Sequence, residues 1–163
     1  GALDLEIDYA YEETPLGSGG AIAAAAAGWT EPFLVCNGDI ITDQSLKSLM
    51  DRHREKKDTD STYLATLMVV PMISPYGLVD LGAQDQVLGF REKVEMPHWI
   101  NAGVYVFERR IAEELPELGD HETETFPRLA QDGKISALRC RGFWRSVDSF
   151  KDLREAEEFI QGC

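Results

Sequence analysis

One candidate for chemistry is a carboxylate that comes directly after an apolar run. Phe33–Cys36 holds four apolar residues without polar alternation, typical of a parallel strand covered on both faces, and Asn37-Gly38-Asp39 follows it. Gly38 lets the backbone turn sharply, so we expect Asp39 to project from the carboxyl end of the strand, where open α/β sheets bind ligands. The same dipeptides are common in ordinary turns, with Thr42 or Asp43 capping the next helix, so both interpretations stay open.

A second carboxylate, Asp148, precedes an apolar pattern of helical spacing over residues 150–160. Its ordinary structural role would be to cap that helix. Asp39 and Asp148 both lie at the ends of apolar segments of a parallel-type sheet, so they could meet above it. Paired carboxylate oxygens that leave room for water and phosphate suit magnesium.

A glycine-rich segment, Pro15-Leu16-Gly17-Ser18-Gly19-Gly20-Ala21, opens an alanine-rich stretch that runs through Ala27 to Gly28. The pattern predicts a helix with Ser18 as its cap. Free N–H groups at a helix start can hold an acceptor-rich ligand. The spacing matches neither the Walker nor the dinucleotide motif, which favours the alternative that the small face only packs against the sheet.

Two further polar groups interrupt apolar segments. Arg91-Glu92-Lys93 follows the apolar residues 87–90, and charges at such a strand end are usually solvated. Asn101 stands near the start of a strand predicted over residues 100–107. Its carboxamide could satisfy backbone groups, or it could present a donor and an acceptor to a hydroxylated ligand.

The remaining pattern predicts the elements that would position these side chains. We expect an edge strand at 3–9, a helix at 44–57, a strand at 63–70 closed by Pro71, a hairpin at 76–81 and 87–92, short helices at 111–115 and 123–131, a strand at 134–141 and a helix at 150–160. Strands alternating with helices imply right-handed crossovers and an α/β fold with a mostly parallel sheet.

Composition narrows the class of protein. A chain of 163 residues with 44% hydrophobic residues fits one globular domain. The formal net charge of -13 argues against general binding to nucleic acid or to an anionic membrane. The sequence has no membrane-spanning apolar run and no signal-like start, so we expect a cytoplasmic protein. The three cysteines and three histidines are scattered, which fits neither disulfides nor a zinc site.

These segments, in this order, resemble the sugar-1-phosphate nucleotidyltransferases. The segment from Glu13 to Ala21 looks like the base-contacting loop of that family, and Asn37-Gly38-Asp39 looks like its magnesium-binding strand end. Tyr76-Gly77, Glu92-Lys93 and Asn101-Ala102-Gly103 look like its sugar-phosphate pocket. The resemblance implies a three-layer α/β/α fold with a mostly parallel mixed sheet, of the Rossmann-like nucleotidyltransferase type.

The resemblance also implies roles for single residues. Asp39 and Asp148 would hold Mg²⁺ and Lys93 would bind the sugar phosphate, and these three form the predicted catalytic set. Gly77, Glu92 and Asn101 would contact sugar hydroxyls. The nucleotide would be bound by Leu16, Gly17, Gly19 and Gly20.

Two departures from the family pattern stand out. Many relatives end in Trp-x-Asp-x-Gly-Thr, whereas this chain has Ser146 at that aspartate position. A second family pattern, Phe-Trp-x-x-x-Asp-Thr, matches residues 143–149 and favours Asp148. The other departure is that no segment matches the family's first strand and its glycine loop with an arginine. We therefore expect one nucleotidyltransferase domain over residues 1–163, truncated on its N-terminal side and inactive by itself.

The leading hypothesis is an enzyme that joins a nucleoside triphosphate to a sugar 1-phosphate, of mannose or glucose type, and releases pyrophosphate. The alternative is a non-catalytic nucleotide-sugar-binding or regulatory subunit of the same fold. A homo-oligomer is compatible with either, because an open sheet edge can pair with another chain.

Overall fold

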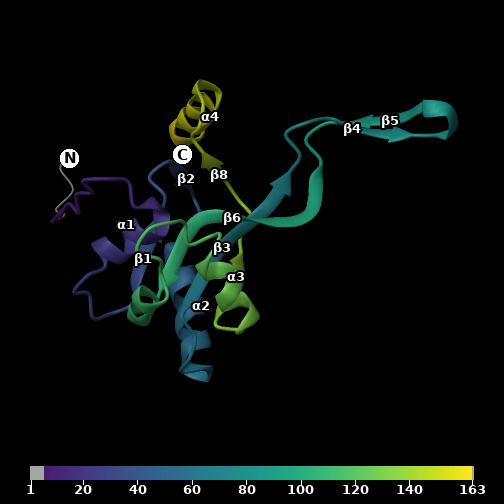
Figure 1. Cartoon of the computed structure of the whole chain (residues 1–163). Helices are drawn as coiled ribbons and strands as arrows, with labels where there is room; N and C mark the ends of the chain where they lie inside the picture. Colours follow the sequence, from purple (N-terminus) through teal and green to yellow (C-terminus); the bar gives the residue numbers. More distant parts are fainter. Residues whose placement is uncertain (1–5, 163) are drawn as a thin grey trace. The chain divides into compact units, whose positions relative to one another are not determined.

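The computed structural model describes residues 6–162, and Figure 1 shows its helices and strands. The elements are α1 Gly17–Ala25, β1 Phe33–Cys36, β2 Ile40–Thr42, α2 Leu46–Thr59, β3 Ala65–Ile73, β4 Leu78–Leu81, η1 Ala83–Asp85, β5 Val87–Arg91, β6 Glu95–Phe107, η2 Arg109–Glu113, α3 Thr125–Gln131, β7 Ile135–Arg139, β8 Trp144–Ser146 and α4 Phe150–Gln161.

The strands form one larger sheet and two small ones. The four-stranded sheet has the order β1-β6-β3-β7. Strand β2 pairs with β8, and β4 pairs with β5, both antiparallel. Parallel and antiparallel strands occur together with helices, so the predicted α/β class with a mixed sheet is confirmed.

The chain divides into two compact units. The described part of the first unit comprises residues 6–35, Met50–Thr66 and Tyr105–Ser136; that of the second comprises Cys36–Leu49, Leu67–Val104 and residues 137–162. The core of the first unit is aromatic. Tyr105 and Phe107 stack with ring centroids 5.3 Å apart, and Phe126 meets both rings edge-on.

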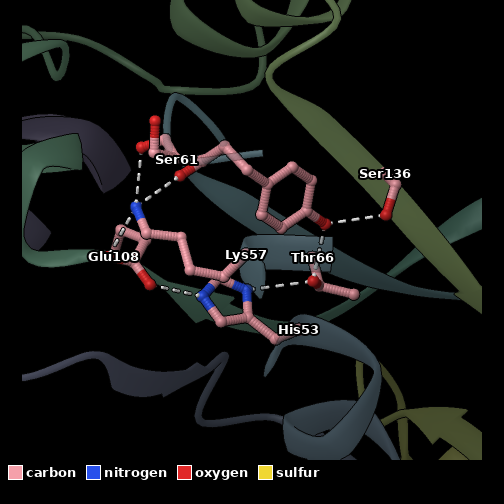
Figure 2. A network of polar contacts seen from close by, with 7 residues as sticks. His53, Lys57, Ser61, Thr66, Glu108 and Ser136 are labelled. Atoms are coloured by element: carbon pink, nitrogen blue, oxygen red, sulfur yellow. Dashed lines mark hydrogen bonds and ion pairs between the residues drawn. The ribbon is translucent and has the colours of Figure 1, made fainter. Parts of the chain in front are cut away.

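A buried polar network links α2 to the strands of the first unit, as Figure 2 shows. His53 on α2 is 2% exposed; its Nδ1 lies 3.0 Å from Thr66 Oγ1 and its Nε2 lies 3.1 Å from Glu108 Oε1. Lys57, one turn further along α2, lies 3.2 Å from Glu108 Oε2. Burial lowers the pKa of His53, although Glu108 opposes this effect. A neutral imidazole therefore joins the helix to the sheet.

In the second unit, α4 has a well-defined start. The Ser149 side chain accepts a hydrogen bond from the Asp152 backbone N–H, which makes Ser149 the N-cap. The ordinary structural role considered for Asp148, capping this helix, is thus filled by the next residue. Phe143 and Phe159 stack with centroids 3.8 Å apart, which fixes the apolar face of the helix.

Strand β3 runs through Pro71, so the prediction that this proline closes the strand is wrong. The backbone N of residue 71 points the same way as the Val69 carbonyl, because residues two apart in a strand share a side. That carbonyl accepts from Cys140 N at 2.9 Å, just past the end of β7 at Arg139. Pro71 therefore lies beyond the partner strand, where a missing N–H costs little.

Three other predictions differ from the structure. Residues 6–9 form no strand, and residues 3–5 lie outside the described part of the chain. The helix predicted at 111–115 is the 3₁₀ turn η2. Ser18 is predicted as the N-cap of α1, but the N-cap residue is Leu16, and no side chain forms a capping hydrogen bond there.

Candidate functional site

Asp39 lies in the tight turn that joins β1 to β2. The turn is closed by a hydrogen bond from Ile40 N to Asn37 O at 3.4 Å. The backbone carbonyl of Asp39 accepts from Val147 N at 2.9 Å, which ties the turn to the residue after β8. The Asp39 side chain is exposed, so its carboxylate is available to a ligand.

The two predicted metal ligands converge on one hydroxyl group. Ser146 Oγ lies 3.2 Å from Asp39 Oδ2 and 3.0 Å from Asp148 Oδ2. Neither carboxylate forms an ion pair with a lysine, arginine or histidine within residues 6–162. Two negative groups thus face one neutral hydroxyl, an arrangement that a cation would stabilise.

Strand pairing sets this geometry. In the antiparallel ladder, Ile40 is opposite Ser146 and Thr42 is opposite Trp144, so Ser146 stands beside the Asp39 turn. The Trp144 indole N–H donates to the Ala102 carbonyl at 2.9 Å, which anchors β8 to β6. Asp148 follows two residues after Ser146. Because Ser149 caps α4, the Asp148 side chain does not serve as the cap and can face Asp39.

The predicted sugar residues Gly77 and Glu92 lie together at the base of the β4–β5 hairpin. A Cβ atom on Gly77 would lie 2.4 Å from Phe90 Cζ and 2.9 Å from Glu92 Oε1, so a larger residue here would require the Phe90 and Glu92 side chains to shift. Lys93 follows in a left-handed conformation, with φ of 50°. This conformation is uncommon for a residue with a side chain and tends to persist where function requires it. Lys93 is exposed.

Asn101 belongs to a second polar group, at the start of the buried part of β6. Its Oδ1 accepts from Gly103 N at 3.2 Å, and the Gly103 carbonyl accepts from Asn37 N at 2.8 Å. Gly103 has φ of 71°, and a Cβ there would lie 2.7 Å from Asn37 Nδ2. The Asn-Ala-Gly segment is thereby connected to the turn that carries Asp39.

The glycine-rich start of α1 belongs to the first unit and packs against another backbone segment. A Cβ on Gly17 would lie 2.6 Å from the Gly119 carbonyl oxygen, and one on Gly20 would lie 2.6 Å from that of Glu117. Gly19 N donates to the Gly119 carbonyl at 2.9 Å, and Ser18 N donates to Asp120 Oδ1 at 3.0 Å. Two N–H groups at this helix start therefore already have acceptors in the chain, and the nucleotide assignment of Leu16, Gly17, Gly19 and Gly20 stays a prediction.

The Ser18 side chain also joins the start of α1 to the segment around residue 120, a contact region called the α1 junction below. Its hydroxyl donates to Glu122 Oε2 at 2.8 Å and lies 2.9 Å from His121 Nδ1. A hydroxyl has one proton, so Nδ1 of the neutral ring must carry the proton of the second bond. The other ring nitrogen, Nε2, is buried and has no hydrogen-bond partner among residues 6–162. Burial lowers the pKa of His121, against the opposing charges of Glu122 and Asp120.

A profile of the nucleotidyl transferases matches residues 1–162 of this chain. The chain belongs to the nucleotidyl transferase family. Among curated relatives, a mannose-1-phosphate guanylyltransferase of Mycobacterium tuberculosis is 36% identical over 99% of this chain and 44% of its own length. The catalytic subunit beta of a mannose-1-phosphate guanylyltransferase from Dictyostelium discoideum is 35% identical over 93% of this chain and 43% of its own length. The chain thus spans less than half of these relatives.

A solved structure supports the fold. HddC from Yersinia pseudotuberculosis superposes with a TM-score of 0.70, covering 96% of this chain and 68% of that chain, at 22% sequence identity. At this identity the likeness concerns the fold alone and carries no residue roles.

A divalent metal fits the oxygens at Asp39 and Asp148. Mg²⁺ prefers one or two carboxylates together with waters and substrate phosphates over a dedicated protein cage. Within residues 6–162, no group of three or more His, Cys, Asp or Glu side chains is arranged to hold a metal ion. Burial is the main cause that raises the pKa of the neighbouring Cys36 thiol, and the negative charge of Asp39 raises it further.

Sequence reasoning does not single out two side chains that contact the residues of this candidate site. The family pattern makes Ser146 only an alternative to Asp148, whereas in the structure its hydroxyl lies within hydrogen-bond distance of both carboxylates. The Asn-Gly dipeptide predicts only a turn at Asn37, whereas its backbone N–H donates to the Gly103 carbonyl and its side chain lies beside Gly103. For Ser146, the sequence does hold a signal. Trp144 and Ser146 are two residues apart, so in a strand their side chains lie on the same face.

A pocket of about 420 Å³ lies elsewhere, in the first unit. It is lined by Glu31, Pro32, Phe33, Leu34, Met50, His53, Arg54, Lys57, Asp58, Val106 and Glu108, none of which is a predicted site residue.

Over residues 6–162, no helix has the length and apolarity required to cross a bilayer.

Proposed function

We propose that the intact protein joins a nucleoside triphosphate to a sugar 1-phosphate and releases pyrophosphate, with GTP and mannose 1-phosphate as its substrates. The observation that carries the proposal is the convergence of Asp39 and Asp148 on Ser146 in a member of the nucleotidyl transferase family. The choice of GTP and mannose follows the names of the two relatives that are 36% and 35% identical.

In this reaction a phosphate oxygen of the sugar 1-phosphate attacks the α-phosphorus of the triphosphate. A bond forms between them, the bond from the α-phosphorus to the bridging oxygen breaks, and pyrophosphate leaves with that oxygen. Phosphoryl-type transfers depend mainly on positioning and charge neutralisation, and need no covalent intermediate with the protein.

Each residue group has a distinct part in the proposal. Asp39 and Asp148 would hold Mg²⁺, whose charge offsets that of the phosphates when it is bound. Lys93 would receive the sugar phosphate as a compact cation. The hydroxyls of the sugar would meet Glu92 and Asn101, with Gly77 keeping the space open. The nucleotide would bind along Leu16, Gly17, Gly19 and Gly20.

The test is pyrophosphate release by the intact protein with Mg²⁺ and a panel of triphosphates and sugar 1-phosphates. We expect Asp39→Asn and Asp148→Asn each to lower kcat by about 100-fold or more, equal to about 2.7 kcal/mol of barrier. Asp58→Asn, on the exposed face of α2, is the matched control and should leave kcat unchanged. Binding of GTP without pyrophosphate release from any pair would indicate a binding or regulatory subunit instead.

The proposal extends to a cytoplasmic location and to assembly as a homo-oligomer. Fractionation of cells and light scattering of the purified protein test these two points.

A further inference from the structure

The pocket of about 420 Å³ in the first unit borders the polar network of Figure 2. Glu108 lies between two other lining residues, with Oε1 3.1 Å from His53 Nε2 and Oε2 3.2 Å from Lys57 Nζ. The Lys57 ammonium also donates to the backbone carbonyls of Ser61 and Tyr63, at 3.0 and 3.3 Å. The charge of Lys57 and two of its three N–H groups are therefore already paired within the protein.

The proton of the neutral His53 ring is paired as well. A carboxylate only accepts hydrogen bonds, so Nε2 carries the proton and donates it to Glu108. Nδ1 then accepts from the Thr66 hydroxyl, 3.0 Å away. Thr66 accepts in turn from the Tyr63 hydroxyl at 2.7 Å, and Tyr63 accepts from Ser136 Oγ at 2.7 Å. The donors run in one direction and end at Glu108, so the imidazole has no N–H left for a ligand.

The pocket instead offers acceptors and negative charge. A carboxylate has about four lone-pair sites, and that of Glu108 has only the two partners named above among residues 6–162. Glu31, an exposed lining residue, has no hydrogen-bond or ion-pair partner in the same part of the chain. Arg54, the second cation of the lining, lies 3.0 Å from Asp51. Carboxylate oxygens with free lone pairs therefore face the pocket.

Apolar side chains form the rest of the lining. Leu34 on β1 and Met50 on α2 are each 39% exposed, and the buried Phe33 and Val106 line the same space. The volume falls within the range of small-molecule sites, roughly 300–1,000 Å³. A ligand that fits must therefore combine an apolar body with hydrogen-bond donors.

We propose that this pocket binds an organic amine, whose ammonium or guanidinium group donates to Glu108 and whose apolar body covers Leu34 and Met50. The net charge of -13 attracts cations to such a site. An anion would bring further acceptors to Glu108 without a donor between them, which is costly. No lining residue belongs to the predicted nucleotide, sugar or cation sites, so the proposal does not depend on the proposed function.

The test compares three probes that share a phenyl ring on a two-carbon spacer, added to the intact protein. Phenethylamine has a positive charge and N–H donors, its N,N,N-trimethyl derivative has the charge alone, and 3-phenylpropionate has a negative charge. We expect saturable binding of phenethylamine with a dissociation constant on the order of 1 mM, as befits so small a ligand. Without N–H groups, binding should be about tenfold weaker. The carboxylate should not bind.

Methionine methyl NMR locates the bound probe. The phenyl ring should shift the methyl resonance of Met50, which lines the pocket, and leave that of Met68 unchanged, because Met68 is 0% exposed and outside the lining. The Met50 resonance is assigned by its loss in Met50→Leu. Ligand-observed NMR titration then measures the affinity of each variant.

Two substitutions change the charge of the pocket without touching the buried network. Met50→Lys adds a cation to the lining and should weaken phenethylamine at least tenfold. Ser48→Lys is the matched control, since it adds the same charge to α2 at an exposed residue outside the lining, and should stay within about twofold. Glu31→Gln should weaken binding about twofold to fivefold, and high salt should abolish this difference.

Each part of the proposal has its own contrary result. Absence of saturable phenethylamine binding, or binding without a shift of the Met50 methyl group, would overturn the site. Equal affinity for phenethylamine and 3-phenylpropionate would show an apolar pocket without preference for cations. Equal affinity for the amine and its trimethyl derivative would overturn donation to Glu108. Equal weakening by Met50→Lys and Ser48→Lys would attribute the effect to net charge alone and contradict the assigned position.

Discussion

At the scale of single residues, Lys93 combines a backbone conformation that side chains disfavour with an exposed cation. Holding a residue other than glycine in the left-handed region costs about 1 kcal/mol. The structure keeps Lys93 there, at φ of 50°, directly after Glu92. A side chain at this position therefore carries a backbone cost that glycine would not.

We predict that Lys93→Gly separates these two effects. Glycine relieves the backbone, so the free energy of unfolding should be unchanged or rise by up to about 1 kcal/mol. The dissociation constant for sugar 1-phosphate should rise about tenfold or more, while that for the triphosphate alone stays the same. Calorimetric titration of each ligand checks this. Gln84→Gly, at a hairpin residue with φ of 58°, is the control that changes the backbone alone. Equal loss of both ligands would reject the assignment of Lys93.

At the scale of elements, the start of α1 depends on residues far away in the sequence. The helix has no side-chain cap of its own at Leu16, and Asp120 accepts from Ser18 N in its place. The Ser18 hydroxyl is then held by His121 and Glu122. The helix start is therefore as stable as the segment around residue 120.

A pair of His121 variants tests this dependence. The asparagine amide can reproduce the Nδ1–H donor, whereas the glutamine amide reaches the Nε2 position, and both lose the ring contact with Phe126 at 4.6 Å. We expect His121→Asn to retain about 1 kcal/mol more stability than His121→Gln, the value of the bond to Ser18. Chemical denaturation measures the difference, and hydrogen exchange should be faster in α1 of the glutamine variant. Equal stability of the two variants would contradict the described α1 junction.

The same element shows where sequence reasoning succeeds and where it stops. The helices and the β4–β5 hairpin follow from periodicity and turn residues, since these signals are local. The partner of Ser18 is about one hundred residues away, and no local pattern identifies it. Likewise, Asp39 and Asp148 were predicted as strand-end carboxylates, but the role of Ser146 between them depends on the register of β2 against β8. Register between short strands is a tertiary property.

At the scale of the whole molecule, two buried histidines connect stability to pH. Burial lowers the pKa values of His53 and His121 in the folded chain. In the unfolded chain both return to about 6.5, so the unfolded state binds more protons once the pH approaches that value. Stability contributed by these residues is therefore complete above pH of about 6.5 and is lost as the pH falls through the folded pKa values.

We accordingly expect the free energy of unfolding to fall as the pH drops below about 6.5. Urea denaturation at a series of pH values measures the slope. His53→Gln should flatten it, because glutamine does not titrate. A slope that survives replacement of both His53 and His121 would show that other groups are responsible.

The bond between the Trp144 indole and the Ala102 carbonyl has a spectroscopic consequence. Trp144 shares a strand face with Ser146, because the two residues are two apart on β8. Its fluorescence should therefore respond to an ion held by Asp39 and Asp148. Trp29 is 55% exposed, and the guanidinium carbons of Arg139 and Arg141 lie 5.3 and 5.1 Å from the Trp99 ring centroid. Since the sequence has three tryptophans, replacing these two by phenylalanine leaves Trp144 as the only one. Paramagnetic Mn²⁺ should quench that emission whereas Mg²⁺ should not, so the fluorescence of Trp144 would report binding of the cation.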